Sequence, residues 1–137
     1  MAQRLWVERH SDGSWHAYND EGAHITFGKE KGQFTPGDLM KIALAGCSAL
    51  TSSYAIEKAL GENHGATIIV DGTHNTIDNE YVNFSEQIQV DATEANLSDE
   101  EAQKLEETIT RHIAKGCTVQ RTYEQATPVR KSITIKR

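Results

Sequence analysis

The apolar residues of this chain alternate with polar ones in several short segments and form two longer segments of helical character. Leu5 and Val7 lie between polar or aromatic neighbours, and turn-forming sequences separate this segment from the next ones. Period-2 alternation predicts strands, because successive side chains of a strand point to opposite faces. We expect strands over residues 5–8, 15–18, 24–27, 66–70, 81–91 and 129–135, and turn-like sequence over 71–80.

The clearest strand covers residues 81–91. Its apolar face carries Val82, Phe84, Ile88 and Val90, and its other face is polar. Glu86 falls on the apolar face and breaks the pattern. A carboxylate on such a face is costly unless it is paired. Either the strand leaves the core at Glu86, which is the commoner case, or Glu86 forms a buried pair with an arginine.

The first helix is predicted from Pro36 to Leu60. Thr35 can cap it, Pro36 suits the first helical position and Asp38 suits a capping box. The segment that follows is apolar on nearly every side and contains many small residues, which predicts a helix buried in a core and closely approached by another backbone. Gly61 is the predicted stop.

The second helix is predicted from Ser98, with Glu101 completing a capping box, to Gly116. The element order is then β-β-β-α-β-β-α-β, which favours an α+β fold with mainly antiparallel sheet. Neither a repeat nor a long linker divides the sequence, so we expect one domain over residues 1–137.

Charge and composition narrow the function classes. The chain has 20 acidic and 14 basic residues and a net charge of −6. Scattered lysines and arginines on an acidic protein argue against nucleic acid as the main partner. The N-terminal residues lack an apolar signal core, and we expect no apolar run of membrane-spanning length. These features predict a cytoplasmic protein that does not bind membranes.

Two cysteines, Cys47 and Cys117, carry the candidate chemistry. In a reducing compartment such a pair is more often free or redox-active than a structural bridge. Cys47 lies within the predicted buried helix, where a cysteine often serves only as a small apolar residue. A reactive Cys47 requires a thiolate, which burial disfavours and a nearby cation stabilises. Arg9, on the strand face of Leu5 and Val7, and Arg121 are the candidate cations.

Cys117 directly follows the predicted helix stop, where the backbone can move. This position suits a resolving cysteine, which attacks a sulfenic acid and closes a disulfide. The histidines lack the spacing of metal ligands, although His112 and Cys117 are close in sequence. Without a glycine-rich phosphate loop, nucleotide binding is unsupported too. We therefore expect neither a metal nor another cofactor.

The sequence resembles the OsmC/Ohr family in two segments. One runs from Thr35-Pro36-Gly37-Asp38-Leu39-Met40 through Ala43-Leu44-Ala45-Gly46 to Cys47, and the other is the helix from Ser98 followed by Cys117-Thr118-Val119-Gln120-Arg121. The resemblance covers nearly the whole chain. It implies an OsmC-like fold with antiparallel sheets around a long central helix, in an intertwined homodimer with two sites at the subunit interface.

The resemblance also implies a reaction. Cys47 would be the peroxidatic cysteine that reduces hydroperoxides, Cys117 its resolving partner and Arg9 the activating arginine. A dithiol donor, such as a lipoylated protein, or a small thiol would reduce the disulfide. Family members usually carry a glutamate where this chain has Gly37, so Asp38, Glu86 or Glu30 would have to supply that carboxylate. They commonly carry proline where this chain has Thr118.

A second function is compatible with the missing glutamate: a non-catalytic OsmC-like domain that binds a small apolar ligand at its dimer interface. This alternative predicts an ordinary Cys47 pKa, whereas the peroxidase predicts a lowered one.

Overall fold

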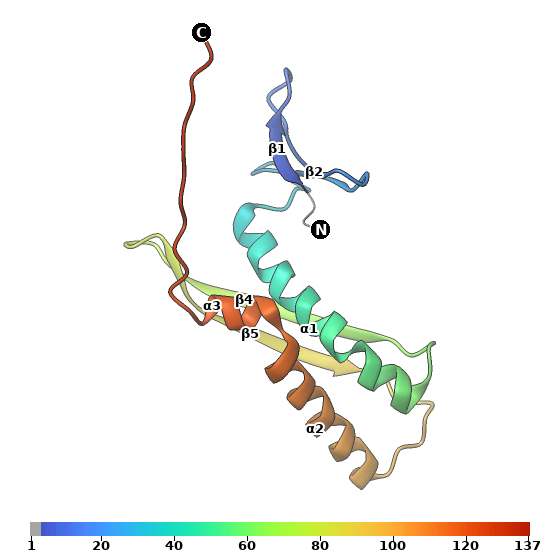
Figure 1. The fold of residues 1–137 in the computed structure, drawn as a ribbon. Coiled ribbons are helices and arrows are strands. Elements are labelled where there is room, and N and C mark those ends of the chain that lie inside the picture. Colours follow the sequence, from blue (N-terminus) through green and yellow to red (C-terminus); the bar gives the residue numbers. More distant parts are fainter. Residues whose placement is uncertain (1–3) are drawn as a thin grey trace. The chain divides into compact units, whose positions relative to one another are not determined.

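The structure is a computed structural model that describes residues 4–137 (Figure 1). It forms two compact units, Met1–Ile42 and Ala43–Arg137. The order of elements confirms an α+β protein with antiparallel sheets and one long helix. The elements are β1 (Leu5–Arg9), β2 (Trp15–Asn19), β3 (His24–Phe27), α1 (Pro36–Leu60), β4 (Ala66–Asn75), β5 (Glu80–Val90), α2 (Asp99–Gly116) and α3 (Thr118–Tyr123).

The N-terminal unit contains an antiparallel sheet in the order β1-β2-β3. The strands lie where alternation predicted them. One face carries Leu5, Val7 and Ile25, which are exposed within this unit. An uncovered apolar sheet face of this kind is typical of a surface that another protein segment covers.

Stacked rings cover the opposite face of this sheet. The ring centroids of Tyr18 and His24 are 4.7 Å apart, and those of His10 and His16 are 3.7 Å apart. His16 Nδ1 and His24 Nε2 share a hydrogen bond of 2.7 Å. Desolvation, followed by the neighbouring His10 and His24, lowers the pKa of His16. The lowered pKa favours the neutral form of His16. Across residues 4–137 no three His, Cys, Asp or Glu side chains converge as metal ligands.

Helix α1 begins and ends as its sequence predicts. The backbone N–H of Thr35 donates to Asp38 Oδ2 at 2.9 Å, and that of Asp38 donates to Thr35 Oγ1 at 3.1 Å, which completes a capping box. At the other end Gly61 adopts a φ of +89°, which favours glycine and stops the helix.

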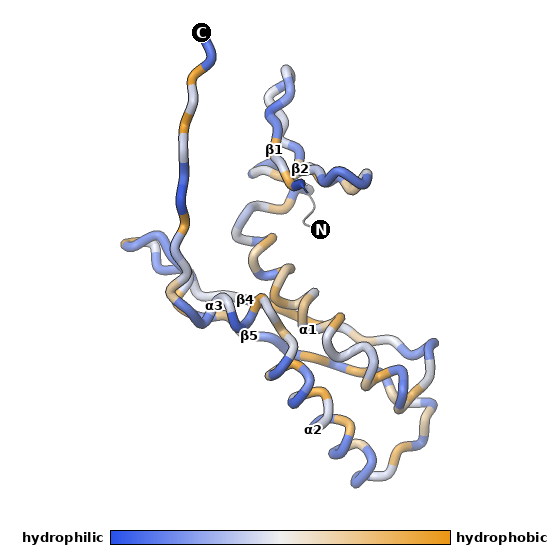
Figure 2. The backbone as a smooth tube through the Cα atoms, in the orientation of Figure 1, coloured by the Kyte–Doolittle hydropathy of each residue, from blue (hydrophilic) through white to orange (hydrophobic). Residues whose placement is uncertain are grey.

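The expectation that α1 is buried on all sides was wrong for the single chain. Only one face is buried, and Leu50 on another face is 81% exposed. A Cβ added at Gly46 would meet nothing within 4 Å, so no backbone of this chain approaches the helix there. Figure 2 shows α1 as the longest predominantly apolar element. Nothing else in residues 43–137 covers its second apolar face.

By length and composition α1 could also cross a membrane, since an 18-residue window of it has a mean hydropathy of 1.3. The expectation that no apolar run reaches this length was therefore wrong. Core helices of soluble proteins share this property, and the buried face of α1 contacts β5 and α2.

Strands β4 and β5 form an antiparallel hairpin that is longer than predicted. β4 continues to Asn75, through a stretch that its polar sequence had indicated as turn, and a bulge lies between Thr73 and His74. Its partner β5 is long enough to pair with all of it, and cross-strand hydrogen bonds outweigh weak local propensity. Along β5 the alternation is confirmed from Phe84 to Val90, and Glu86 lies half-buried on the apolar face. The predicted alternation was wrong at Val82, which is 56% exposed beside the bulge.

Helix α2 supplies the other half of the core. Ser98 and Glu101 form the predicted capping box, with hydrogen bonds of 3.1 Å in both directions. Ile109 packs against the buried end of α1, formed by Ala55, Ile56 and Leu60. Leu105 and Ile113 lie on the same stripe and flank this contact. The α1–α2 packing thereby fixes the position of the last residues of α2.

Two parts of the C-terminal region differ from the prediction. Cys117 is followed by the short helix α3 rather than by mobile chain. The predicted strand over 129–135 is absent within residues 4–137, because this extended segment has no hydrogen-bonded neighbour strand there. Its alternating Val129, Ile133 and Ile135 are exposed. A strand needs a partner strand, which the sequence pattern of one segment cannot supply.

Candidate functional site

The two cysteines lie next to each other although they are 70 positions apart in the sequence. Cys47 belongs to the middle of α1, and Cys117 is the residue between α2 and α3. A close approach at Gly116 makes this contact feasible, since an added Cβ there would lie 3.0 Å from Thr51 Cγ2 of α1. Glycine therefore brings the α2–α3 junction against the helix that carries Cys47. Both cysteines are free.

Hydrogen-bond donors surround the Cys47 sulfur. The backbone N–H of Val119 contributes most, and further donors are the Cys117 thiol, the Thr51 hydroxyl and the backbone N–H of Thr118. These donors outweigh the effect of burial and lower the pKa of Cys47 below its ordinary value. Cys47 is also half-exposed, so a small substrate can reach it. The site thus stabilises a reachable thiolate.

Cys117 has the opposite environment. It is 0% exposed, and burial is the main reason why its pKa is raised. Its hydrogen bond to Cys47 acts in the same direction, because the thiol proton of Cys117 stabilises the Cys47 thiolate. The pair is therefore asymmetric, with a thiolate at Cys47 and a thiol at Cys117. This is the protonation that a nucleophilic cysteine and a waiting second cysteine require.

The expectation that a thiolate at Cys47 requires a cation was too narrow. The groups that lower its pKa are neutral donors, led by the Val119 amide in the first turn of α3. Arg121 lies on α3, but its guanidinium donates to the carbonyl of Lys115 at 3.3 Å and so serves the end of α2. A proline at position 118, common in the family, would remove one amide donor and retain that of Val119.

Arg9 and Asp38 belong to the N-terminal unit. Arg9 lies opposite Trp15 in the sheet, and its guanidinium reaches the turn at Gly13. The activation of Cys47 by Arg9 stays a prediction from the resemblance. The carboxylate of Asp38 accepts a hydrogen bond from Thr35, and this bond lowers the pKa of Asp38. Asp38 thus serves as a helix cap, and no catalytic role is visible for it in residues 4–42.

Glu86 reaches the cysteine pair through Ser48. The Ser48 hydroxyl, on a residue that is 0% exposed, donates to Glu86 Oε2 at 3.2 Å. The same hydroxyl is hydrogen-bonded to the Cys117 sulfur. Within residues 43–137 no arginine pairs with Glu86, and its buried Oε1 has no hydrogen-bond partner there. The strand does not leave the core at Glu86, so the commoner of the two sequence-based alternatives was wrong.

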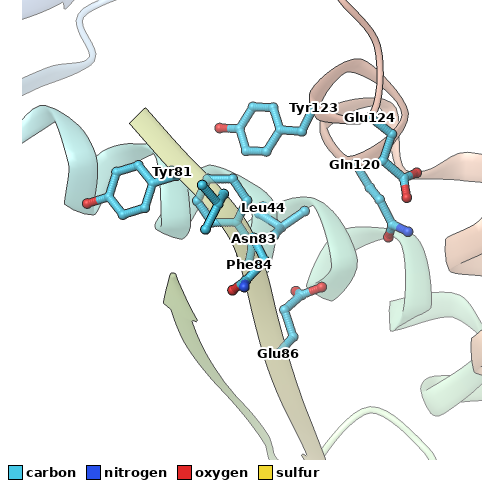
Figure 3. Close-up of a pocket in the computed structure, with 9 residues that line it drawn as sticks. Leu44, Tyr81, Asn83, Phe84, Glu86, Gln120, Tyr123 and Glu124 are labelled. Carbon is cyan, nitrogen blue, oxygen red and sulfur yellow. The ribbon is translucent and has the colours of Figure 1, made fainter. Parts of the chain in front are cut away.

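A cavity of about 410 Å³ lies beside this network (Figure 3). Its residues come from α1, β5 and the end of α3, and they combine aromatic rings with a few polar groups. They are Leu44, Tyr81, Val82, Asn83, Phe84, Glu86, Gln120, Tyr123 and Glu124. The ring centroids of Phe84 and Tyr123, which both line the cavity, are 5.3 Å apart. Rings and polar groups contribute about equally to its lining, so it suits a small molecule that carries both apolar and hydrogen-bonding groups.

Sequence reasoning missed Ser48, Thr51 and the amides of α3. Ser48 and Thr51 were indicated only weakly, as hydroxyl residues one and four positions after Cys47 on an apolar helix. The stretch from Thr118 to Tyr123 contains neither glycine nor proline, which was the available signal for α3. Ser48, Thr51 and the amides of α3 surround the two cysteines only because two segments that are distant in the sequence are in contact.

Comparisons with known proteins agree with this architecture. The family model of the OsmC-like protein matches residues 28–132. An uncharacterized protein of Mycobacterium tuberculosis is 34% identical over 128 residues, which cover 92% of each chain. The OsmC-like protein of Mycoplasma pneumoniae has a TM-score of 0.68 at 16% identity, with 92% of this chain and 89% of that chain covered.

The organic hydroperoxide resistance protein OhrB of Bacillus subtilis has a TM-score of 0.56 at 12% identity, with 92% of this chain and 93% of that chain covered. Likeness at this identity concerns the fold. The family match extends from the loop before α1 to the extended C-terminal segment and so includes both cysteines. On the family match and the 34% identical relative, this chain belongs to the OsmC-like protein family.

Proposed function

We propose that this protein is a cytoplasmic thiol peroxidase that reduces organic or other hydroperoxides through Cys47 and Cys117. One observation carries the proposal: a half-exposed Cys47 sulfur accepts hydrogen bonds from amides and from the Cys117 thiol, which lower its pKa. Low thiol pKa together with accessibility is the property that separates reactive from structural cysteines. Two free thiols held side by side also suit a reducing compartment such as the cytoplasm.

The proposed cycle uses both cysteines. The Cys47 thiolate attacks the terminal hydroperoxide oxygen, the O–O bond breaks, and the leaving alkoxide takes a proton to become the alcohol. Cys47 is then a sulfenic acid. Cys117 attacks its sulfur, forming a disulfide and releasing water. A dithiol such as a lipoylated protein reduces the disulfide, and attack at the half-exposed Cys47 sulfur rather than at buried Cys117 is sterically favoured.

The pH dependence of Cys47 alkylation tests the thiolate. Because hydrogen bonds lower its pKa, the thiolate persists at pH values where an ordinary cysteine, with a pKa near ~8.5, is protonated. When the rate of Cys47 labelling by iodoacetamide is plotted against pH, the midpoint of the curve should therefore lie clearly below that value. Buried Cys117 should label slowly. Mass spectrometry after labelling distinguishes the sites. A Cys47 midpoint equal to that of a model thiol would contradict the proposal.

A second function is supported by the cavity beside the network. Its volume of about 410 Å³ and the rings among its mixed lining suit a small ligand with an apolar part, and the chain has Gly37 where the family usually has glutamate. A non-catalytic ligand-binding protein would then retain the fold without peroxide turnover. The alkylation experiment separates the two, because only the peroxidase requires a lowered Cys47 pKa.

The proposed active form is an intertwined homodimer. Several apolar surfaces that the chain leaves uncovered support it: the sheet face with Leu5 and Val7, the face of α1 with Leu50 and Tyr54, and the unpaired C-terminal segment. Cys47 lies on α1 one turn before Leu50, so a second copy on this face would also enclose the site. Exposed apolar surface of this extent is characteristic of a protein interface.

The dimer predicts a matched pair of outcomes. The protein should sediment at twice its chain mass of 15.2 kDa, and Leu50→Lys should shift it toward the single-chain mass, because a charge in an apolar interface lacks a partner. Ile77→Lys is the control, since Ile77 is 92% exposed in the hairpin turn and is not part of the surfaces named above. A wild-type chain that sediments as a monomer would contradict the dimer.

A further inference from the structure

The buried position of Cys117 raises a problem for the resolving step, on which the proposed function depends. Cys117 carries a proton in the resting pair and must lose it before its sulfur can attack. It is 0% exposed, so bulk water does not contact the thiol. Once Cys47 is a sulfenic acid it is no longer the thiolate that accepted this hydrogen bond, and its neutral sulfur is a much weaker base. A different base beside Cys117 would therefore speed the loss of the proton.

The neighbours of Cys117 provide one. Ser48 is 0% exposed, its hydroxyl donates to Glu86 Oε2 at 3.2 Å, and it is close enough to the Cys117 sulfur to lower the pKa of that thiol. A hydroxyl can donate one proton while accepting another, so Ser48 can connect the thiol to the carboxylate. Glu86 lies on the apolar face of β5, where a carboxylate is costly without a function or a partner. Its Oε1 is buried and has no hydrogen-bond partner within residues 43–137.

We propose that Glu86 accepts the proton of Cys117 through Ser48 when the Cys47–Cys117 disulfide forms. The carboxylate touches neither the peroxide nor a cysteine, so Glu86 is a positioning residue that acts through Ser48. It also lines the cavity between β5 and the end of α3, which gives the proton an exit (Figure 3). This role explains why the one acidic residue on the apolar face of β5 points to a buried serine.

In the resolving step, protons move from Cys117 to Ser48 and from Ser48 to Glu86 while the disulfide forms. Cys117 gives its thiol proton to Ser48 Oγ, and Ser48 gives its own hydroxyl proton to Glu86 Oε2. The Cys117 sulfur bonds to the Cys47 sulfur while the Cys47 S–O bond breaks, and the leaving hydroxide takes a proton from solvent to become water. The Cys117 sulfur is oxidised and the sulfenic sulfur is reduced. Glu86 then returns its proton to solvent through the cavity, so no net proton is consumed.

A mixed disulfide isolates this step from peroxide chemistry. Reaction of Cys47 with dithiobis(nitrobenzoate) releases one thionitrobenzoate and leaves a mixed disulfide. Attack by Cys117 then releases a second thionitrobenzoate, which absorbance follows in time. The first release reports Cys47 and the second reports deprotonation and attack by Cys117. Because no hydroperoxide is involved, a failure of peroxidase activity would overturn the proposed function without affecting this measurement.

Glu86→Gln should slow the second release about 100-fold at pH 7, the lower end of the usual contribution of a positioned base. The rate of the variant should rise about tenfold per pH unit as hydroxide replaces the lost base, while the wild-type rate changes little. Glu86→Asp should restore part of the rate at pH 7. The first release should be unchanged in every variant.

Glu80→Gln is the matched control, because Glu80 lies on the same strand β5 but is exposed and is not one of the residues that line the cavity. It should leave both releases unchanged. A Glu86→Gln protein that closes its disulfide at the wild-type rate and with the wild-type pH profile would overturn the proposal. If Glu86→Gln does not fold, as judged by circular dichroism, Ser48→Ala tests the same relay. It should show the same slowing and slope, and wild-type closure in that variant would also overturn the proposal.

Discussion

Replacing Cys47 with serine is expected to abolish peroxide turnover, with a loss of roughly 10³-fold or more, as is usual when a nucleophile is removed. The amides of Val119 and Thr118 and the Cys117 thiol stabilise a sulfur anion, whereas a serine hydroxyl stays protonated in the same place. Coupled assays with an alkyl hydroperoxide and a dithiol reductant measure the effect. If wild-type protein is inactive with several hydroperoxides and reductants, the proposed function is wrong.

Cys117→Ser is the control for this result. It should retain one rapid reaction with peroxide per Cys47 and then stop, because the sulfenic acid cannot form its disulfide and proceeds to sulfinic acid with more peroxide. Intact-mass measurement detects the added oxygens. The substituted residue is buried next to Ser48, so circular dichroism should confirm that the variant is folded. Equal losses in both variants at the first reaction with peroxide would argue against separate roles for the two cysteines.

Ile109→Ala is expected to lower the free energy of unfolding by about 3 kcal/mol, within the range for a large core residue replaced by alanine. Ile109 is 8% exposed and packs against Ala55, Ile56 and Leu60, so its truncation leaves a space between α1 and α2. Urea denaturation followed by circular dichroism measures the change. The same contact holds the end of α2 that carries Cys117 near Cys47, so peroxide turnover should also fall.

Ile77→Ala is the matched control, because Ile77 is 92% exposed in the turn of the β4–β5 hairpin. Ile77→Ala removes the same side-chain atoms as Ile109→Ala but loses little apolar contact. Surface substitutions usually change the free energy of unfolding by less than about 0.5 kcal/mol. Both variants should be compared at one protein concentration, since a dimer gains stability with concentration. Equal effects of the two substitutions would show that Ile109 does not contribute to a packed core.

The local elements were predictable where a local signal decides the structure. Both capping boxes, at Thr35 and Ser98, and the glycine stop at Gly61 form as expected, because each depends on groups within a few positions of one another. The alternation along β5 was equally reliable from Phe84 to Val90. The extension of β4 and the unpaired C-terminal segment were not predictable, since whether a stretch forms a strand depends on a neighbour elsewhere in the chain.

The candidate site followed a similar division. The identity of Cys47 and Cys117 as the redox candidates came from their number, spacing and family resemblance. The source of the thiolate did not, because sequence reasoning assigned it to arginine and overlooked α3. Backbone amides belong to every residue and so leave no mark in the sequence, and only the fold shows which of them point at a sulfur.

By itself, the sequence determined the two helices with their caps, the α+β class, the family and the pair of cysteines, because all of these follow from local patterns and residue types. The tertiary structure alone decided that Cys117 lies buried beside Cys47, that amides of α3 favour a thiolate there, and that Glu86 reaches the pair through Ser48. The physical reason is that a pKa and a proton path depend on contacts between segments far apart in the chain, and these contacts exist only after α1, β5 and α2 have packed.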